Sequence, residues 1–217
     1  MTDQIDPSSG QLARAFDDLE YEEQCQVSSH WSASRLLLLA SLFLYGTFVF
    51  AYFYLRALNN HGLWRIGDQH ASAIIGTTIA VLVVLSGLIH YIGARRLQIG
   101  SRVDWQVGAL VSLILIAVAT GLQIWDLTRL PFRPASSAYT GIFITWSAVY
   151  IVYLLGQFYW LETLLAQSIA NRRSVLQETP EGLIVVSRFG ANVEGYVLFS
   201  QFMVIATIVM WLLFYIV

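Results

Sequence analysis

The stretch Leu36 to Leu55, LLLLASLFLYGTFVFAYFYL, contains no charged side chain. Arg35 stands immediately before it and Arg56 immediately after it. An α-helix rises about 1.5 Å per residue, so about 20 apolar residues cross the ~30 Å hydrocarbon core of a bilayer. This stretch therefore predicts a membrane-spanning helix at 36–55.

Four more runs of similar length and character follow it. They cover residues 71–93, 105–125, 139–161 and 196–217. Apolar residues make up 57% of the 217 positions and charged residues 12%, against about 45–50% and 25% in an average soluble domain. Backbone polar groups in lipid need internal partners, which a helix supplies. The sequence therefore predicts an all-α, polytopic membrane bundle of five transmembrane helices.

Aromatic residues stand at the ends of several runs. They are Trp105, Trp125, Tyr139, Trp160 and Tyr215. Because amphipathic rings prefer the headgroup region of a bilayer, we expect these rings at its two interfaces.

The distribution of arginine predicts the orientation, because the chain has no lysine. If the N-terminus is cytoplasmic, eight arginines lie inside and four outside. The inner eight are Arg14, Arg35, Arg95, Arg96, Arg102, Arg172, Arg173 and Arg188, and the outer four are Arg56, Arg65, Arg129 and Arg133. Cytoplasmic loops of membrane proteins carry the excess of basic residues. We therefore expect the N-terminus in the cytoplasm and the C-terminus outside.

The soluble parts are predicted to be small. Residues 1–33 form a cytoplasmic acidic tail, in which residues 1–10 are expected to be disordered and Gln11–Gln24 to form a short helix. This tail is either a solvated segment or a docking element for a basic patch on a partner. Residues 34–217 form the transmembrane domain. Its cytoplasmic loop at 163–193 is expected to continue the fourth helix to about Arg173 and to turn at Thr179–Gly182.

Residues that perform catalysis are scarce. The single cysteine, Cys25, excludes disulfides within the chain and a Cys-x-x-Cys-His haem attachment. No nucleotide-binding motif is present, and no carboxylate is expected at depth, since Asp104, Asp126, Glu162 and Glu194 stand at run ends. His90 is the one histidine inside a run, where we expect it at headgroup level with a satisfied hydrogen bond. The sequence predicts no catalytic residue, no metal site and no nucleic-acid partner.

Several segments resemble subunit III of the haem–copper oxidases, in particular its short five-helix bacterial form. The stretch Ser34–Arg56 resembles the family's helix that ends in A-Y-F-Y-L-R, here with Tyr52 and Arg56, and the following loop resembles the family's loop with its Trp, here Trp64. Gly121–Asp126 followed by Ser136–Phe143 is similar to a later passage between two helices. Glu194, Gln201 and Trp211 stand at positions comparable to those of the family's last helix.

The chain departs from the family pattern at ionisable positions. Ser41 stands where family members usually carry a membrane-embedded Glu, fifteen residues before the motif Arg. Gln201 replaces the His of the final helix, and the run 139–161 lacks the family's pair of His. A proton-uptake role that depends on those groups is therefore altered in this chain.

The resemblance implies a non-catalytic subunit of a bacterial cytochrome c oxidase, an enzyme complex in the plasma membrane. It implies packing on subunit I beside subunit II, bound phospholipid, support of proton uptake, and haem and copper in the partner subunits. Cytochrome c or a larger supercomplex is a further partner that it allows. Lipid contacts are then expected at Arg56, Trp64, His90, Arg95 and Arg96.

Two alternatives remain open from the sequence. A subunit III relative attached to a nitric oxide reductase, or to another respiratory assembly, would have the same pattern. A small oligomeric permease would need a polar path across the bilayer, which the expected absence of buried carboxylates disfavours. Arg56, in turn, either binds lipid phosphate or only extends to the headgroups as many interfacial arginines do.

Overall fold

The computed structural model describes residues 7–58, 62, 64–65, 71–134, 136–170 and 188–216. Within these ranges the chain folds into five long helices and contains no strand. The helices are α1 (Pro7–Ala57), α2 (Ala73–Gln98), α3 (Arg102–Thr128), α4 (Ala138–Ala170) and α5 (Arg188–Trp211), and α5 ends in a π-helical turn, Leu212–Ile216. Each of the five is long and apolar enough to cross a membrane, which confirms the predicted all-α bundle of five spans.

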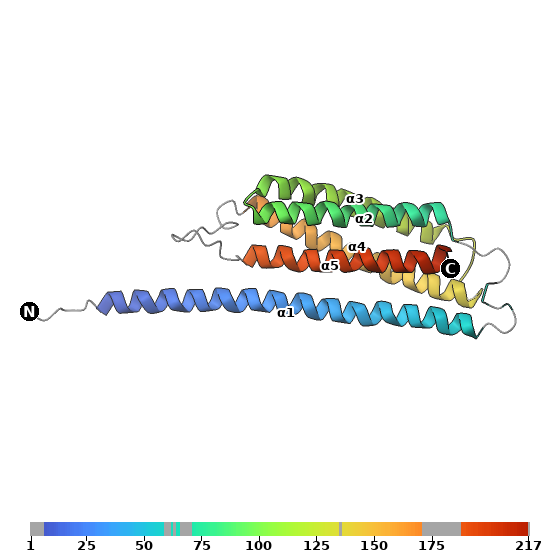
Figure 1. The fold of residues 1–217 in the computed structure, drawn as a ribbon, viewed down its shortest axis with the longest axis horizontal. Helices are drawn as coiled ribbons and strands as arrows, with labels where there is room; N and C mark the ends of the chain where they lie inside the picture. The colour runs from blue at the N-terminus through green and yellow to red at the C-terminus, as the bar shows by residue number, and fades with distance from the viewer. Residues whose placement is uncertain are drawn as a thin grey trace, which may run out of the picture.

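Helices α2 to α5 pack together, and α1 lies along one side of them (Figure 1). α1 contacts α5 and α4. α1 and α3 end at one end of the bundle, which we call the α1–α2 end, and the turn between α2 and α3 lies at the other, the α2–α3 end. The N-terminal part of α1 projects beyond the α2–α3 end (Figure 1).

The prediction of a separate short helix before the first span is wrong. Residues 7–57 form one helix of 51 residues, about 76 Å long, because no proline follows Pro7 until far beyond this segment. Pro7 itself stands at the first helical position, where its missing N–H costs no hydrogen bond. Residues 7–10, expected to be disordered, are helical, and residues 1–6 lie outside the described residues.

The other helices also extend beyond the predicted apolar runs. α2 continues to Gln98, because polar residues at a membrane surface prolong a helix without penalty. α4 is helical to Ala170, and α5 begins at Arg188. The predicted end near Arg173 and the turn at Thr179–Gly182 lie outside the described residues.

α2 and α3 approach each other most closely, because small residues line their contact. A Cβ added to Gly108 would lie 3.4 Å from the Ile89 carbonyl oxygen, and one added to Gly93 would lie 3.5 Å from the Trp105 Cα. Next to this contact, Ser86 and Ser112 bond to each other's backbone. These contacts hold α2 and α3 as an antiparallel pair.

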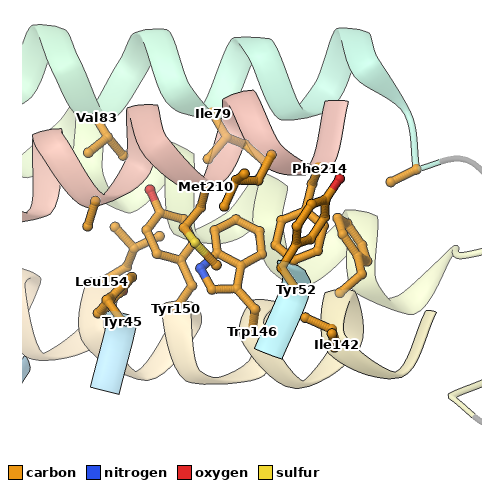
Figure 2. Close-up of a cluster of buried hydrophobic side chains, with 14 of the residues drawn as sticks. Tyr45, Tyr52, Ile79, Val83, Ile142, Trp146, Tyr150, Leu154, Met210 and Phe214 are labelled. Atoms are coloured by element: carbon orange, nitrogen blue, oxygen red, sulfur yellow. The ribbon is translucent and has the colours of Figure 1, made fainter. Parts of the chain in front are cut away.

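The interior is aromatic toward the α1–α2 end. Figure 2 shows Tyr52 of α1, Trp146 and Tyr150 of α4, and Phe214 after α5 pointing toward one another. Of the rings expected at the membrane interfaces, Trp105 and Tyr139 are fully buried against other helices, and Trp125 is exposed. Their placement at the two interfaces stays a prediction.

Candidate functional site

An aromatic cluster at the α1–α2 end joins residues from three of the segments on which the family resemblance rests. It consists of Tyr52, Trp64, Tyr139, Phe143 and Phe214. Tyr52 meets Trp64 edge-on, with ring centroids 5.0 Å apart, and Trp64 meets Tyr139 at 5.9 Å. Phe214 closes the group at 5.6 Å from Tyr52 and 5.3 Å from Phe143.

Hydrogen bonds fix this cluster to the backbone. The Tyr139 N–H donates to the Trp64 carbonyl (3.1 Å), which ties the α1–α2 loop to the first turn of α4. The Tyr139 hydroxyl donates to the Phe214 carbonyl (3.2 Å), which ties α4 to the end of the chain. The Arg65 guanidinium carbon lies over the Tyr139 ring, 4.3 Å from the ring centre.

Arg56 lies at the surface beside this cluster. Its Nη1 donates to the Tyr52 hydroxyl (3.3 Å), and its guanidinium carbon lies 5.9 Å from the Tyr52 ring centre. The Arg56 side chain is exposed, so the remaining N–H groups face outward. The predicted lipid contact at Trp64 is wrong for its side chain, which is 7% exposed and packed in the aromatic cluster.

An apolar groove opens between α1 and α4 near the same end. Its volume is about 360 Å³. It is lined by Thr47, Phe48, Ala51, Leu55, Ala138, Gly141, Ile142 and Thr145. Leu55 of the groove directly precedes Arg56 in α1, so the charged residue is the next one along the helix from the apolar lining. An acyl chain next to a phosphate matches that arrangement.

Arg95 and Arg96 lie at the other end of the bundle and are exposed. The Arg95 Nη2 donates to the Tyr91 hydroxyl (2.9 Å), and its guanidinium lies over the Tyr91 ring. Both arginines are in the last turn of α2, where cations interact favourably with the helix dipole. They are positioned for headgroup contacts.

His90 is buried between helices. Its side chain is 1% exposed and packs edge-on against Tyr196 (4.6 Å between ring centres), with Trp105 at 6.3 Å. Neither His90 nitrogen has a hydrogen-bonding partner among the described residues. The predicted hydrogen bond is therefore wrong among the described residues, because the α2 face that carries His90 turns toward α3 and α5, while the predicted headgroup depth stays a prediction.

The side chains at the other family-motif positions form hydrogen bonds within a helix or between helices. The Ser41 hydroxyl, fully buried, donates to the Leu37 carbonyl of its own helix (2.7 Å). The Gln201 amide donates to the Gly87 carbonyl of α2 (3.4 Å), and Glu194 accepts from the Gln98 amide (3.2 Å). The Trp211 indole donates to the Thr77 hydroxyl (3.0 Å). Both Gln201 and Trp211 thereby link α5 to α2.

Two buried polar side chains were missed by the sequence interpretation. Asp126, expected at the end of a span, is 4% exposed, and its Oδ2 atom has no partner in the described part of the chain. Gln157, inside the fourth run, is 1% exposed. The available signal was spacing: Thr120, Gln123 and Asp126 recur every three residues, which places them on one face of α3.

The described residues contain no group of three or more His, Cys, Asp or Glu side chains that could hold a metal ion. No protein-family model matches the chain, and no curated protein matches it.

Proposed function

We propose that this chain is a non-catalytic membrane subunit of a bacterial terminal respiratory oxidase, of the subunit III type. In this role it packs on the haem-bearing subunit I, binds phospholipid and stabilises the oxygen-reducing complex in the plasma membrane, with its N-terminus cytoplasmic. Haem and copper belong to the partner subunits. The enzymatic activity belongs to the complex.

The aromatic cluster is the observation that carries this proposal. The A-Y-F-Y-L-R motif supplies Tyr52, the loop supplies Trp64, and the later passage supplies Tyr139 and Phe143. Tyr52 and Trp64 are 12 residues apart, Tyr139 follows 75 residues after Trp64, and all three meet in one contact group. Residues that carry the resemblance are thus joined in a single core, as expected when a family pattern preserves packing.

The lipid part of the proposal rests on Arg56 and the α1–α4 groove. Arg56 holds its position through Tyr52 and keeps exposed N–H groups one residue along α1 from the groove lining. A phospholipid would place its phosphate at Arg56 and an acyl chain along Ala51 and Ile142. The long exposed faces of α1 supply further lipid or subunit contact, since large apolar side chains such as Phe43 and Phe50 point away from the bundle.

Isolation of the tagged chain from its native membrane in mild detergent tests the proposed function. We expect a complex that retains a haem protein and consumes oxygen. A haem-bearing complex that consumes nitric oxide and not oxygen would assign the chain to a nitric oxide reductase assembly. A stable, monodisperse chain that retains no haem protein would overturn the proposal.

A matched pair of variants tests the lipid site in the same preparation. Arg56→Gln should lower the phospholipid that remains bound, and Ala51→Trp, which fills the groove, should lower it too. Arg129→Gln is the control, because Arg129 is exposed, lies over Trp125, and does not line the groove. Equal lipid content in all three variants and the unchanged chain would exclude the groove as the binding site.

A further inference from the structure

A layer of polar side chains crosses the interior of the four-helix unit α2–α5. We call it the polar layer; it consists of Ser86, His90, Ser112, Gln157, Tyr196 and Ser200, with the indole of Trp105 at its edge. All seven side chains are nearly inaccessible, at 2% exposure or less. Ser86 and Ser112 are satisfied by each other's carbonyls. The remaining five residues are not.

Six polar atoms of this layer have no hydrogen-bonding partner in the described structure. They are His90 Nδ1 and Nε2, Trp105 Nε1, Gln157 Oε1, Tyr196 Oη and Ser200 Oγ. Leaving a buried donor or acceptor unpaired costs about 1–3 kcal/mol per group. Six such atoms in one place would approach the whole stability of a typical domain, about 5–15 kcal/mol.

The six atoms come from neighbouring side chains. The rings of His90 and Tyr196 are in contact, and Trp105 is the next ring along. The Gln157 side chain lies close enough to the Tyr196 hydroxyl to interact with it, but the two do not have the geometry of a hydrogen bond. Ser200 follows Tyr196 by one helical turn, and its Oγ would lie 3.5 Å from a Cβ at Gly87, one turn before His90. The four helices therefore direct their polar groups to a common level.

Apolar side chains close the layer toward the α1–α2 end. On each of the four helices, an apolar residue stands one helical turn nearer that end than a residue of the polar layer. The pairs are Ser86 with Val83, Ser112 with Ile116, Gln157 with Leu154, and Ser200 with Met203. Each of the four apolar residues is at most 1% exposed. Toward the α2–α3 end, the Phe189 ring covers Trp105 (5.3 Å), and Leu161 and Val193 are buried beside it. Apolar side chains therefore border the polar layer on both sides along the bundle.

The set of donors and acceptors in the layer suits water. A neutral imidazole offers one donor and one acceptor, the indole one donor, the amide oxygen an acceptor, and each hydroxyl both. Buried waters typically make about three hydrogen bonds to such groups, so about two molecules would satisfy the six atoms. We propose that the polar layer is an internal hydration site, in which bound water bridges His90, Trp105, Gln157, Tyr196 and Ser200.

This site is independent of the proposed function, because it rests on α2–α5 alone. It assigns His90 the role of binding internal water, which differs both from a contact with lipid headgroups and from packing in a dry interior. The histidine is held among water molecules inside the membrane, bordered by apolar residues at both ends of the layer.

Water-edited solid-state NMR of the full chain in lipid bilayers tests the proposal. The chain is labelled with nitrogen-15 at the Trp indoles and the His imidazoles. We expect magnetisation to pass from water protons to the Trp105 indole and the His90 imidazole, the latter identified by its correlation with the Tyr196 ring protons. Absence of transfer to both side chains would show a dry layer and overturn the proposal.

Two double variants localise the water. Gln157→Leu with Tyr196→Phe removes two partners from the layer and should abolish the transfer to Trp105. Tyr150→Phe with Thr207→Val removes the hydroxyls of a neighbouring buried pair, which bond to each other (2.8 Å), and should leave it unchanged. Transfer that persists in the first variant would overturn the proposal.

A measurement on the unsubstituted chain keeps the test decisive if the first double variant does not fold. The nitrogen-15 shifts of the His90 imidazole distinguish hydrogen-bonded nitrogens from a free acceptor nitrogen. We expect both nitrogens in hydrogen bonds. A free acceptor nitrogen would contradict the hydration site.

Discussion

Ser86 of α2 and Ser112 of α3 exchange hydrogen bonds across a helix interface. The Ser86 hydroxyl donates to the Ser112 carbonyl (3.1 Å), and the Ser112 hydroxyl donates to the Ser86 carbonyl (2.9 Å). Both side chains are buried, at 1% and 0% exposure. Each carbonyl belongs to a helical backbone and keeps its own helix bond, so the serines add a second link between α2 and α3 within the apolar interior.

Removal of this pair should destabilise the bundle modestly. Interhelical hydrogen bonds in membranes contribute about 0.6 kcal/mol and at most about 1.7 kcal/mol. We expect Ser86→Ala and Ser112→Ala each to lower the free energy of unfolding within that range. A double-mutant cycle by reversible unfolding in mixed micelles measures the coupling between them. Thr78→Val is the control, because the exposed Thr78 hydroxyl bonds only within its own helix (2.8 Å), and it should change stability far less.

Gly76 and Gly121 should respond in opposite directions to the same substitution. A Cβ at Gly76 would overlap the Tyr215 ring, which packs directly on the α2 backbone. Gly121 has no atom within 4 Å of a Cβ. We expect Gly121→Ala to raise the free energy of unfolding by about 0.5–1 kcal/mol, because alanine has a higher propensity than glycine for a helix interior. Gly76→Ala should instead destabilise.

Unfolding measurements on both variants check this contrast. In a Tyr215→Ala background the ring is gone, and the cost of Gly76→Ala should disappear. A cost that remains in this background would mean that the Tyr215 ring is not the obstacle at Gly76.

The aromatic cluster makes a separate prediction about Tyr52, which is fully buried and contacts both Trp64 and Phe214. Tyr52→Ala leaves a large cavity and should cost about 3–5 kcal/mol, the range for truncating a buried aromatic ring. Tyr52→Phe keeps the ring contacts and loses only the bond from Arg56, so we expect a cost of about 1 kcal/mol. Similar losses for the two variants would contradict ring packing as the main contribution.

The five spans could be predicted from sequence because membrane thickness alone sets their length. The stretch 36–55 and the four later runs contain the apolar parts of α1 to α5. The helix ends could not be predicted so well, since a helix continues through polar residues such as Gln98 once it leaves the apolar layer. Length and composition determine which segments cross; they do not determine where the backbone stops being helical.

The direction in which a polar residue faces was the harder prediction. His90 was expected with a satisfied hydrogen bond and Asp126 at the end of a span, whereas both side chains are buried between helices and have atoms without a partner among the described residues. Helix rotation is decided by packing between α2 and α3, where Gly93 and Gly108 allow close approach, and such pair contacts are not visible in one run at a time. The aromatic cluster could not be predicted for the same reason, because Tyr52, Trp64 and Tyr139 come from different segments of the chain.

The continuity of α1 yields a distance prediction. Cys25 is exposed and is the only cysteine of the chain, so it accepts one spin label without further substitution. Phe43→Cys adds a second exposed site, since Phe43 is 76% exposed. Eighteen residues of uninterrupted helix separate the two positions, which corresponds to about 27 Å between their backbones.

Pulsed electron paramagnetic resonance of the doubly labelled chain in lipid nanodiscs measures this separation. We expect one narrow distribution near that distance, because the helix crosses from the acidic segment into the membrane without a hinge. Ser29→Pro is the matched comparison: it removes a backbone hydrogen bond between the two labelled positions and should kink the helix, which shifts and broadens the distribution. A broad distribution in the unbroken chain would instead support the separate short helix that the sequence suggested.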